Sequence, residues 1–526
     1  MDRVGHTVRA AEKLIARHRF KQAVQTLRTA CSENPQSGRL RVELASALAA
    51  SGDFSGATET YFDAFEAGFH HPLILTNLGS SLFRAGRMQE AIIAYREAIR
   101  RDRNFMPAWS NLLLALNCLE DISPRELAQE HWRFGDLQPS IPSAPARRLT
   151  GRLRIGYVSA SFKRHSVAQL FEPVLRTHDR ERFQIFCYQA NSLTDAVTRR
   201  LIQQACHWRF IAGLNQEQAI EAIKQDDIDF LVDLDGHTGG NRLPLFAAKP
   251  ARILITWLGY PNTTGLSAMD YRITDSFADP APFADELNRE KLIRLDPPFL
   301  TFAAPRDSPP VSPAPVLENG YVTFGMFNQV HKLSDGAVSS MAQVLLRVER
   351  SRLVLQCAAF ADGQIRDRIV ERFVRLGIDE DRISCHPAMS QKAHLEMHRF
   401  IDIMLDTFPY TGTTTTCESL WMGVPVVTLL GSTHRERVSA SLLQSTGFSF
   451  LIAGNPEQYV SIAADLASSP ARIVALRDQI RPGLLSSRLM DNTSFTQRFE
   501  NALVAVAGIG SSPEQPLLSP QPSILA

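Results

Sequence analysis

The sequence predicts an α/β protein that begins with an all-α part, and three patterns along the chain support this fold class. A repeat occupies the N-terminal region, as the spacing of 34 positions between Gly52 and Gly86 first indicates. Two sets of short apolar segments then alternate with helical periodicity, which is typical of parallel sheets built from β-α-β units. A proline-rich segment separates the two sets. A chain of 526 residues has room for about three to four domains, and these patterns define three.

The charge and cysteine content exclude several classes of protein. Lys and Arg number 56 against 55 Asp and Glu, and this balance argues against general nucleic-acid binding, which normally needs a basic excess. The seven cysteines are scattered without a C-x-x-C pair, so a disulfide framework or a zinc ribbon is not expected. The N-terminus opens no apolar signal segment, and no run reaches the roughly 18 apolar residues of a membrane span. We therefore expect a cytoplasmic protein with no membrane partner.

Residues 1–118 contain three copies of one pattern. The aligned positions are Ala23, Ala57 and Ala91, then Leu27, Tyr61 and Tyr95, then Ala30, Ala64 and Ala98. The alanines let paired helices approach closely, and the larger side chains fill the groove of the neighbouring pair. The period and pattern resemble tetratricopeptide repeats. Such a solenoid presents a concave surface to an extended polypeptide, and the alternative is a scaffold that only stabilises the chain or joins it into a homodimer.

Proline-rich stretches divide the rest of the chain. We expect a linker at 119–150, a first α/β unit at 151–300, an interlobe linker at 301–318, a second unit at 319–507 and a disordered tail at 508–526. The predicted strands are 154–159, 183–188, 230–234 and 253–257 in the first unit, and 321–325, 352–355, 401–405 and 426–429 in the second. The predicted helices include 216–225, 363–376 and 391–398. Because ligands of open α/β sheets bind at strand carboxyl ends, a shared substrate is expected between the two units.

One segment of the second unit carries the sharpest chemical signal. Gly412 follows a predicted strand and precedes four threonines, 413–416, at the start of a predicted helix. Free N–H groups at a helix start bind anions, and threonine hydroxyls add donors, so this turn is predicted to hold a diphosphate. Glu418 could accept hydrogen bonds from sugar or ribose hydroxyls. The alternative is a threonine cap with a glutamate in the first turn and no ligand.

Three motifs together resemble a known family. The segment from Leu405 to Pro425, with Gly259–Gly265 and Asp270–Ser276, is similar to the nucleocytoplasmic protein O-glycosyltransferases of glycosyltransferase family 41, which includes O-GlcNAc transferase and SPINDLY. The resemblance covers about 150–505, with tetratricopeptide repeats ahead of it. It implies two Rossmann-like lobes in the GT-B arrangement. It also implies inverting, metal-independent transfer of a sugar from a nucleotide donor to Ser or Thr hydroxyls of polypeptides.

The resemblance assigns roles to single residues. It places Lys332 against the donor diphosphate, Gln329 at a phosphate or the sugar, and His165 as an active-site histidine. His237 is expected to face the cleft, although either histidine could instead be a structural hydrogen-bonding residue. Lys332 could also be a solvated surface charge. The family usually has Asp where this chain has Ser161.

Further residues complete the expected donor site. The donor-binding set adds Thr413, Thr414 and Thr415, with Glu418, His394 near the nucleotide base and Arg437, which could equally be a surface charge. Asp233-Leu234-Asp235 spells a D-x-D sequence, a metal-nucleotide motif of another glycosyltransferase fold. Because its surroundings match the metal-free family, we expect no metal and no cofactor.

The donor and the reaction complete the sequence-based hypothesis. An acceptor hydroxyl attacks the anomeric carbon, a nucleoside diphosphate leaves, and Lys332 with the helix start neutralises the departing charge. No side chain is a clear general base. The expected function is transfer of N-acetylglucosamine from UDP-GlcNAc. The alternatives are fucosyl transfer from GDP-fucose, as the resemblance to SPINDLY suggests, and a repeat-based adaptor with inactive lobes.

Overall fold

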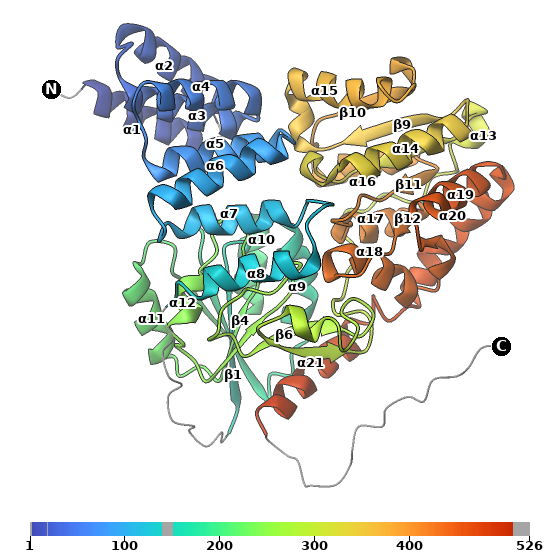
Figure 1. Ribbon diagram of the computed structural model, residues 1–526. Helices are drawn as coiled ribbons and strands as arrows, with labels where there is room; N and C mark the ends of the chain where they lie inside the picture. The colour runs from blue at the N-terminus through green and yellow to red at the C-terminus, as the bar shows by residue number, and fades with distance from the viewer. Residues whose placement is uncertain (1–2, 18, 139–150, 509–526) are drawn as a thin grey trace.

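The computed structural model describes residues 3–17, 19–138 and 151–508, and it confirms the predicted fold class. A helical solenoid precedes two lobes, each built on a parallel sheet (Figure 1). Residues 139–150 of the expected linker and 509–526 of the expected tail lie outside the described residues. In the described part of the chain, no helix combines the length and the apolar character that crossing a membrane requires.

The solenoid consists of antiparallel helical pairs, as the repeat predicts. Its helices are α1 (Arg3–Ala16), α2 (Phe20–Glu33), α3 (Gly38–Ser51), α4 (Phe54–Glu66), α5 (Pro72–Arg84), α6 (Met88–Arg101), α7 (Met106–Leu116) and α8 (Pro124–Gly135). Gly52 and Gly86 adopt φ values of +91° and +76° where the chain turns into a second helix, a conformation that favours glycine. Ala57 and Ala91 are fully buried, so the repeated alanines do mark the closest helix contacts.

The prediction of a linker over 119–150 is wrong for the first half of that range, which contains helix α8. Helix α8 begins with a capping box in which Ser123 and Glu126 satisfy each other's backbone N–H groups. Its buried face carries His131 and Phe134, which pack against the N-terminal lobe. The prolines at 124 and beyond suggested irregular structure, but a proline in the first turn of a helix replaces an N–H that has no intrahelical partner.

The N-terminal lobe contains a seven-stranded parallel sheet in the order β3-β2-β1-β4-β5-β6-β7. The strands are β1 (Leu153–Ser159), β2 (Phe183–Gln189), β3 (His207–Phe210), β4 (Phe230–Asp233), β5 (Ile253–Thr256), β6 (Tyr271–Asp275) and β7 (Lys291–Leu295). The helices are α9 (Ser166–Thr177), α10 (Ala196–Gln204), α11 (Gln216–Gln225) and α12 (Leu243–Ala247), with a 3-10 turn η1 (Asp285–Leu287). The four predicted strands form its buried centre.

The C-terminal lobe contains a six-stranded parallel sheet in the order β10-β9-β8-β11-β12-β13. The strands are β8 (Thr323–Met326), β9 (Arg352–Gln356), β10 (Ile383–His386), β11 (Ile403–Leu405), β12 (Val426–Leu429) and β13 (Ile452–Ala453). The helices are α13 (Val316–Asn319), α14 (Asp335–Arg347), α15 (Gly363–Val374), α16 (Gln391–Met397), α17 (Thr414–Trp421), α18 (His434–Ser445), α19 (Pro456–Ala467) and α20 (Pro470–Leu485), and α21 (Asn492–Val506) follows them in the chain. The 3-10 turns are η2 (Val330–Lys332), η3 (Ala358–Ala361), η4 (Glu380–Arg382), η5 (His398–Phe400) and η6 (Ser449–Leu451).

The last helix does not stay with the lobe that precedes it. Helix α21 crosses to the N-terminal lobe and packs beside α9 (Figure 1). The Thr177 and Thr496 hydroxyl oxygens lie 2.6 Å apart, and the His178 Nδ1 lies 2.8 Å from a Glu500 oxygen. The expected C-terminal unit at 319–507 is therefore contiguous in sequence but not in space, because its last helix belongs to the other lobe's core.

Candidate functional site

The threonine turn is held by a buried carboxylate at the end of β11. Asp406 accepts hydrogen bonds from the Asn328 side-chain amide at 3.0 Å, the Gly412 N–H at 2.9 Å and the Thr428 hydroxyl at 2.8 Å. Burial raises the pKa of Asp406, and hydrogen bonds from Ser439, Thr428 and the Gly412 N–H, with the nearby Lys332, oppose that shift. The carboxylate thereby fixes the backbone that leads into α17.

The threonine side chains at the start of α17 make hydrogen bonds to neighbouring segments rather than a helix cap. The Thr413 side chain at the cap position makes no capping hydrogen bond. The Thr415 hydroxyl donates to Asn328 Oδ1 at 2.9 Å, and the Thr416 and Ser439 hydroxyls lie 2.8 Å apart. The first N–H groups of a helix have no intrahelical partner, so the turn leaves backbone donors at a positive helix end. The side-chain cap that the alternative requires at Thr413 is therefore not formed.

Lys332 lies against the same turn. Its Nζ donates to the Thr411 carbonyl at 2.8 Å and lies 3.7 Å from the centre of the Tyr410 ring. Burial lowers the pKa of Lys332 to about 8, while Asp406 acts to raise it. Gln329 stands exposed just before this turn, at the N-terminal end of η2. The structure therefore brings the predicted lysine and the threonine turn together, and Lys332 is not a freely solvated surface charge.

Glu418 links the threonine helix to a histidine and to the other lobe. One Glu418 oxygen lies 3.3 Å from His394 Nε2, and the other accepts from the Gln169 side-chain amide at 3.4 Å. The second ring nitrogen of His394 lies 2.6 Å from Gln356 Oε1. Because Gln169 comes from α9, the site spans both lobes.

His165 faces the same interlobe space from the N-terminal end of α9. A cavity of about 430 Å³ between the lobes is lined by His165 and Gln169 on one side and by His394 on the other. The His165 Nδ1 accepts from the Val167 N–H at 3.2 Å. Desolvation lowers the pKa of His165, and Lys163 adds to the effect. The imidazole is therefore neutral near pH 7, and the hydrogen bond at Nδ1 places its proton on Nε2.

His237 does not face the cleft, contrary to the expectation. It is fully buried between the solenoid and the N-terminal lobe, where its ring packs against Phe134. Its Nδ1 lies 3.1 Å from the Ser110 hydroxyl and its Nε2 lies 2.9 Å from the Thr264 carbonyl oxygen. Both ring nitrogens thus have protein partners, and burial holds the pKa of His237 far below its usual value. The position matches the structural alternative.

Arg437 joins the two lobes rather than the threonine turn. Its guanidinium donates to the Phe277 carbonyl at 2.7 Å and to the Gly431 carbonyl at 2.8 Å. It also lies over the Phe277 ring, 5.0 Å from its centre. The residue is neither a free surface charge nor, in this structure, a neighbour of Lys332.

The D-x-D aspartates point into the protein. Asp235 accepts from the hydroxyls of Ser159 and Ser161 at 2.9 and 2.7 Å, and Asp233 accepts from the Thr256 hydroxyl at 2.9 Å. Burial and the neighbouring Asp235 raise the pKa of Asp233 to about 7. Ser161, the departure from the family pattern, is thus a structural donor to a buried carboxylate.

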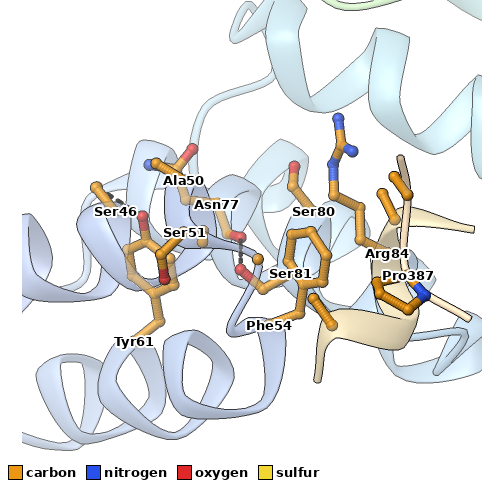
Figure 2. Close-up of a pocket in the computed structure, with 15 residues that line it drawn as sticks. Ser46, Ala50, Ser51, Phe54, Tyr61, Asn77, Ser80, Ser81, Arg84 and Pro387 are labelled. Carbon is orange, nitrogen blue, oxygen red and sulfur yellow. Dashed lines mark hydrogen bonds between the residues drawn. The ribbon is translucent and has the colours of Figure 1, made fainter. Parts of the chain in front are cut away.

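A second cavity lies between the solenoid and the C-terminal lobe (Figure 2). Its volume is about 660 Å³. Polar side chains of α3 to α5, among them Tyr61, Asn77 and Arg84, line one wall, and Ala358 and Pro387 line the other. Inside it the Ser46 and Tyr61 hydroxyl oxygens lie 2.7 Å apart. The repeats therefore leave an open surface of mixed polar and apolar side chains next to the second lobe.

Several residues of the site were not singled out from the sequence. Asp406, Gln356 and Gln169 are those residues, and each stands at or after the end of a strand or near the start of a helix. Asp406 and Gln356 stand at strand carboxyl ends, the edge at which ligands of open α/β sheets bind, so that rule could have found them. Gln169 could not be found in this way, because it lies on a helix and its contact with Glu418 depends on how the two lobes pack against each other.

Comparison with known proteins gives consistent matches. The family model described as glycosyl transferase family 41 matches residues 136–301 and 315–499, and tetratricopeptide models match 14–73 and 59–104. A Petunia hybrida protein named as a probable UDP-N-acetylglucosamine–peptide N-acetylglucosaminyltransferase SPINDLY is 38% identical over 77% of this chain and 44% of its own length. The Arabidopsis thaliana protein SEC, with the same kind of name, is 31% identical over 73% of this chain and 40% of its own length.

A solved structure extends the similarity to the whole described fold. A mutant of the Thermobaculum terrenum O-GlcNAc transferase matches with a TM-score of 0.89 and 30% identity, covering 96% of this chain and 98% of its own. By contrast, the chain spans less than half the length of the two plant relatives.

Proposed function

Because the chain belongs to glycosyl transferase family 41, we propose that it transfers a sugar from a nucleotide donor to Ser or Thr hydroxyls of polypeptides. One observation carries this proposal. The ammonium of Lys332 and the threonine helix start with Glu418 lie on one lobe. Glu418 contacts His394, which lines the interlobe cavity opposite His165. This arrangement supports a nucleotide-sugar transferase, with Lys332 and the threonine helix start proposed as the anion site.

The anion site supports departure of a nucleoside diphosphate. As the glycosidic bond to the diphosphate breaks, negative charge grows on the leaving oxygen. The Lys332 ammonium, the hydroxyls of Thr413 and Thr414 and the N–H groups of α17 are proposed to neutralise it, whereas the Thr415 hydroxyl donates to Asn328 and would have to turn away from it to bind a phosphate. We propose that these groups suffice without a metal ion or another cofactor. Gln329, exposed beside Lys332, is proposed to contact a phosphate or the sugar.

The nucleoside is proposed to lie toward His394 and Glu418. Glu418 presents carboxylate oxygens that can accept from ribose hydroxyls, and the His394 ring offers a flat apolar face to the base. Gln356 fixes the His394 ring through the hydrogen bond at Nδ1.

The acceptor hydroxyl is proposed to attack from the side of His165. The new bond joins the acceptor oxygen to the anomeric carbon, the bond to the diphosphate breaks with inversion, and the hydroxyl proton passes to water. Because the neutral His165 carries its proton on Nε2, it donates a hydrogen bond and orients an oxygen rather than removing a proton. The polypeptide around the acceptor is proposed to follow the solenoid cavity beside Tyr61 and Arg84 (Figure 2).

UDP-GlcNAc is the proposed donor. The names of the SPINDLY and SEC relatives, which specify this donor for those proteins, support the choice. Calorimetric titration of the chain with UDP-GlcNAc and GDP-fucose tests it, followed by mass spectrometry of a mixed Ser/Thr peptide pool. UDP-GlcNAc binding with a peptide mass gain of one N-acetylhexosamine is the expected result. Binding of GDP-fucose alone would instead favour fucosyl transfer, and binding of neither would favour an adaptor with inactive lobes.

A further inference from the structure

The turn that carries Lys332 is packed directly against the solenoid. Phe83, in the last turn of α5, stacks on His331 with ring centres 4.2 Å apart and planes 23° apart. His331 precedes Lys332 in η2. Phe83 is buried, so the stacked pair forms part of a closed interface rather than a surface contact. A repeat helix therefore reaches the residue next to the proposed diphosphate ligand.

The backbone after α5 touches the same turn. A Cβ on Gly86 would lie 2.6 Å from Val330 Cγ1, which is closer than real side chains approach. Arg368 of α15 donates to the Ala85 carbonyl, so the lobe also holds the end of α5. This fit leaves the η2 turn no room to shift toward the solenoid.

The opposite end of the turn is held by the segment after α7. Ser334 donates to the Phe408 carbonyl at 2.6 Å, and its hydroxyl lies 2.5 Å from a Glu120 oxygen. The same Glu120 accepts from the Gly336 N–H at 3.0 Å. The solenoid thus contacts the chain on both sides of Lys332.

We propose that Phe83 is a positioning residue for the reaction, through which the solenoid fixes Lys332 against the threonine turn. This inference rests on the function proposed above. Electrostatic help to a leaving diphosphate depends on a charge held in place before the bond breaks, and a displacement of about 1 Å can cost about 100-fold in rate. The repeats then contribute to turnover as well as to acceptor binding, and the two contributions are separable.

The pKa of Lys332 is a measurable quantity that should change if Phe83 positions this lysine, and should stay the same if Phe83 only stabilises the fold. The titratable groups around Lys332 and its neighbour His331 come from the solenoid, Arg84 and Cys118, and from the C-terminal lobe, Tyr410 and Asp406, and the two residues also act on each other. Burial is the main reason that the pKa of Lys332 falls to about 8. If the turn loosens, water reaches the ammonium and its pKa rises toward the ordinary value for lysine.

The test compares Phe83→Ala and Phe83→Leu with wild type and with Phe62→Ala. Phe62 lies on α4 of the same solenoid and is 54% exposed, so it is a matched aromatic truncation away from the interface. We expect kcat to fall at least about 10-fold in both Phe83 variants, by more than donor affinity falls. The basic limb of the kcat–pH profile should shift to higher pH in Phe83→Ala and stay in place in Phe62→Ala. His331→Phe, which keeps an aromatic partner, should retain more activity than His331→Ala.

NMR titration of ¹³C-labelled lysine, with the Lys332 signal assigned by Lys332→Arg, makes the test independent of turnover. A raised Lys332 pKa in Phe83→Leu, with the thermal unfolding transition retained, supports the inference. An unchanged kcat, or a lower kcat with an unchanged pH profile and an unchanged Lys332 pKa, would overturn it. If wild type transfers no sugar but the NMR shift occurs, the proposed function fails while the positioning contact stands.

Discussion

Arg435 in α18 donates from Nη1 to the Asn117 carbonyl at 2.9 Å, across 318 residues of sequence. The same nitrogen lies 3.2 Å from the Leu116 carbonyl and 3.0 Å from that of Leu119. One buried guanidinium therefore satisfies three carbonyls at and just beyond the end of α7, where helix carbonyls have no partner within the helix. The C-terminal lobe and the solenoid are joined through this cation.

Replacing Arg435 with Met should lower the free energy of unfolding, because Arg435 joins the solenoid to the C-terminal lobe. The change leaves three carbonyls without their charged donor, and we expect unfolding free energy to fall by about 3 kcal/mol. Chemical denaturation of the variant measures the loss, with Arg39→Met on the solenoid surface as the control. A loss no larger than that of the control would show that other contacts carry the junction.

Lys332→Ala should reduce turnover at least about 100-fold, the scale of losing one strong transition-state donor. Steady-state kinetics at saturating donor measure the change, and Lys224→Ala on exposed α11 serves as the control. Retention of the wild-type rate would reject the role of Lys332 as the ligand of the leaving diphosphate.

The rate should also depend on the protonation of Lys332. The charged form is the active one, and its pKa is about 8, so turnover should fall as pH rises through about 8. Lys332→Arg should keep a reduced activity but lose this basic limb, because arginine stays charged. A limb that persists unchanged in Lys332→Arg would have to come from another group.

Glu418→Gln should weaken donor binding more than it slows chemistry. A hydrogen bond to a charged acceptor contributes about 1.5 kcal/mol or more, so the Kd of UDP-GlcNAc should rise roughly 10-fold. Calorimetry measures the Kd, and Glu457→Gln on exposed α19 is the control. Equal affinity in wild type and Glu418→Gln would remove Glu418 from the donor site.

Sugar transfer should continue in excess EDTA. The proposed charge neutralisation uses Lys332 and the helix start, so chelation removes nothing that the reaction needs. Donor turnover with and without EDTA measures this, and parallel thermal unfolding curves show whether chelation harms the fold. Complete loss of activity with an intact fold would contradict the metal-independent mechanism.

Acid should loosen the contact between α8 and the N-terminal lobe. Burial lowers the pKa of His131 to about 4, whereas an unfolded chain binds this proton below about 6.5. Stability should therefore decrease as pH falls from about 6.5 to about 4, by up to about 3 kcal/mol from this group. Denaturation across that range should give a shallower pH slope for His131→Gln than for wild type, and an unaltered slope for His6→Gln. Equal slopes in wild type and His131→Gln would refute this source of acid sensitivity.

The sequence was a good guide where one pattern decided the structure. The repeated alanines located the solenoid, and the central strands were predictable because burial on both faces leaves continuous apolar runs. Strands β3, β7 and β10 lie at sheet edges and are partly exposed, so they lack such runs and were not predicted. The two-residue edge strand β13 is too short to give a pattern, and the buried interior strand β6 was missed because polar residues interrupt its apolar ones. The threonine turn was singled out from residue types, whereas Lys332 was assigned through the family resemblance. His237 was misplaced because its partner surface, α8, lies in a segment whose prolines suggested a linker.

Helix α21 has a consequence for how this molecule can be divided. Its Phe495 and Phe499 rings pack against Trp257 of the N-terminal lobe, with ring centres 6.0 and 5.0 Å away. A truncation before Asn492 would thus expose Trp257 and the apolar residues around it, and so would destabilise the N-terminal lobe although the cut lies after the C-terminal lobe. A workable N-terminal fragment needs this final helix supplied in trans. In such a two-piece protein, the affinity of the separate helix for the remaining chain would measure how strongly α21 holds the two lobes together.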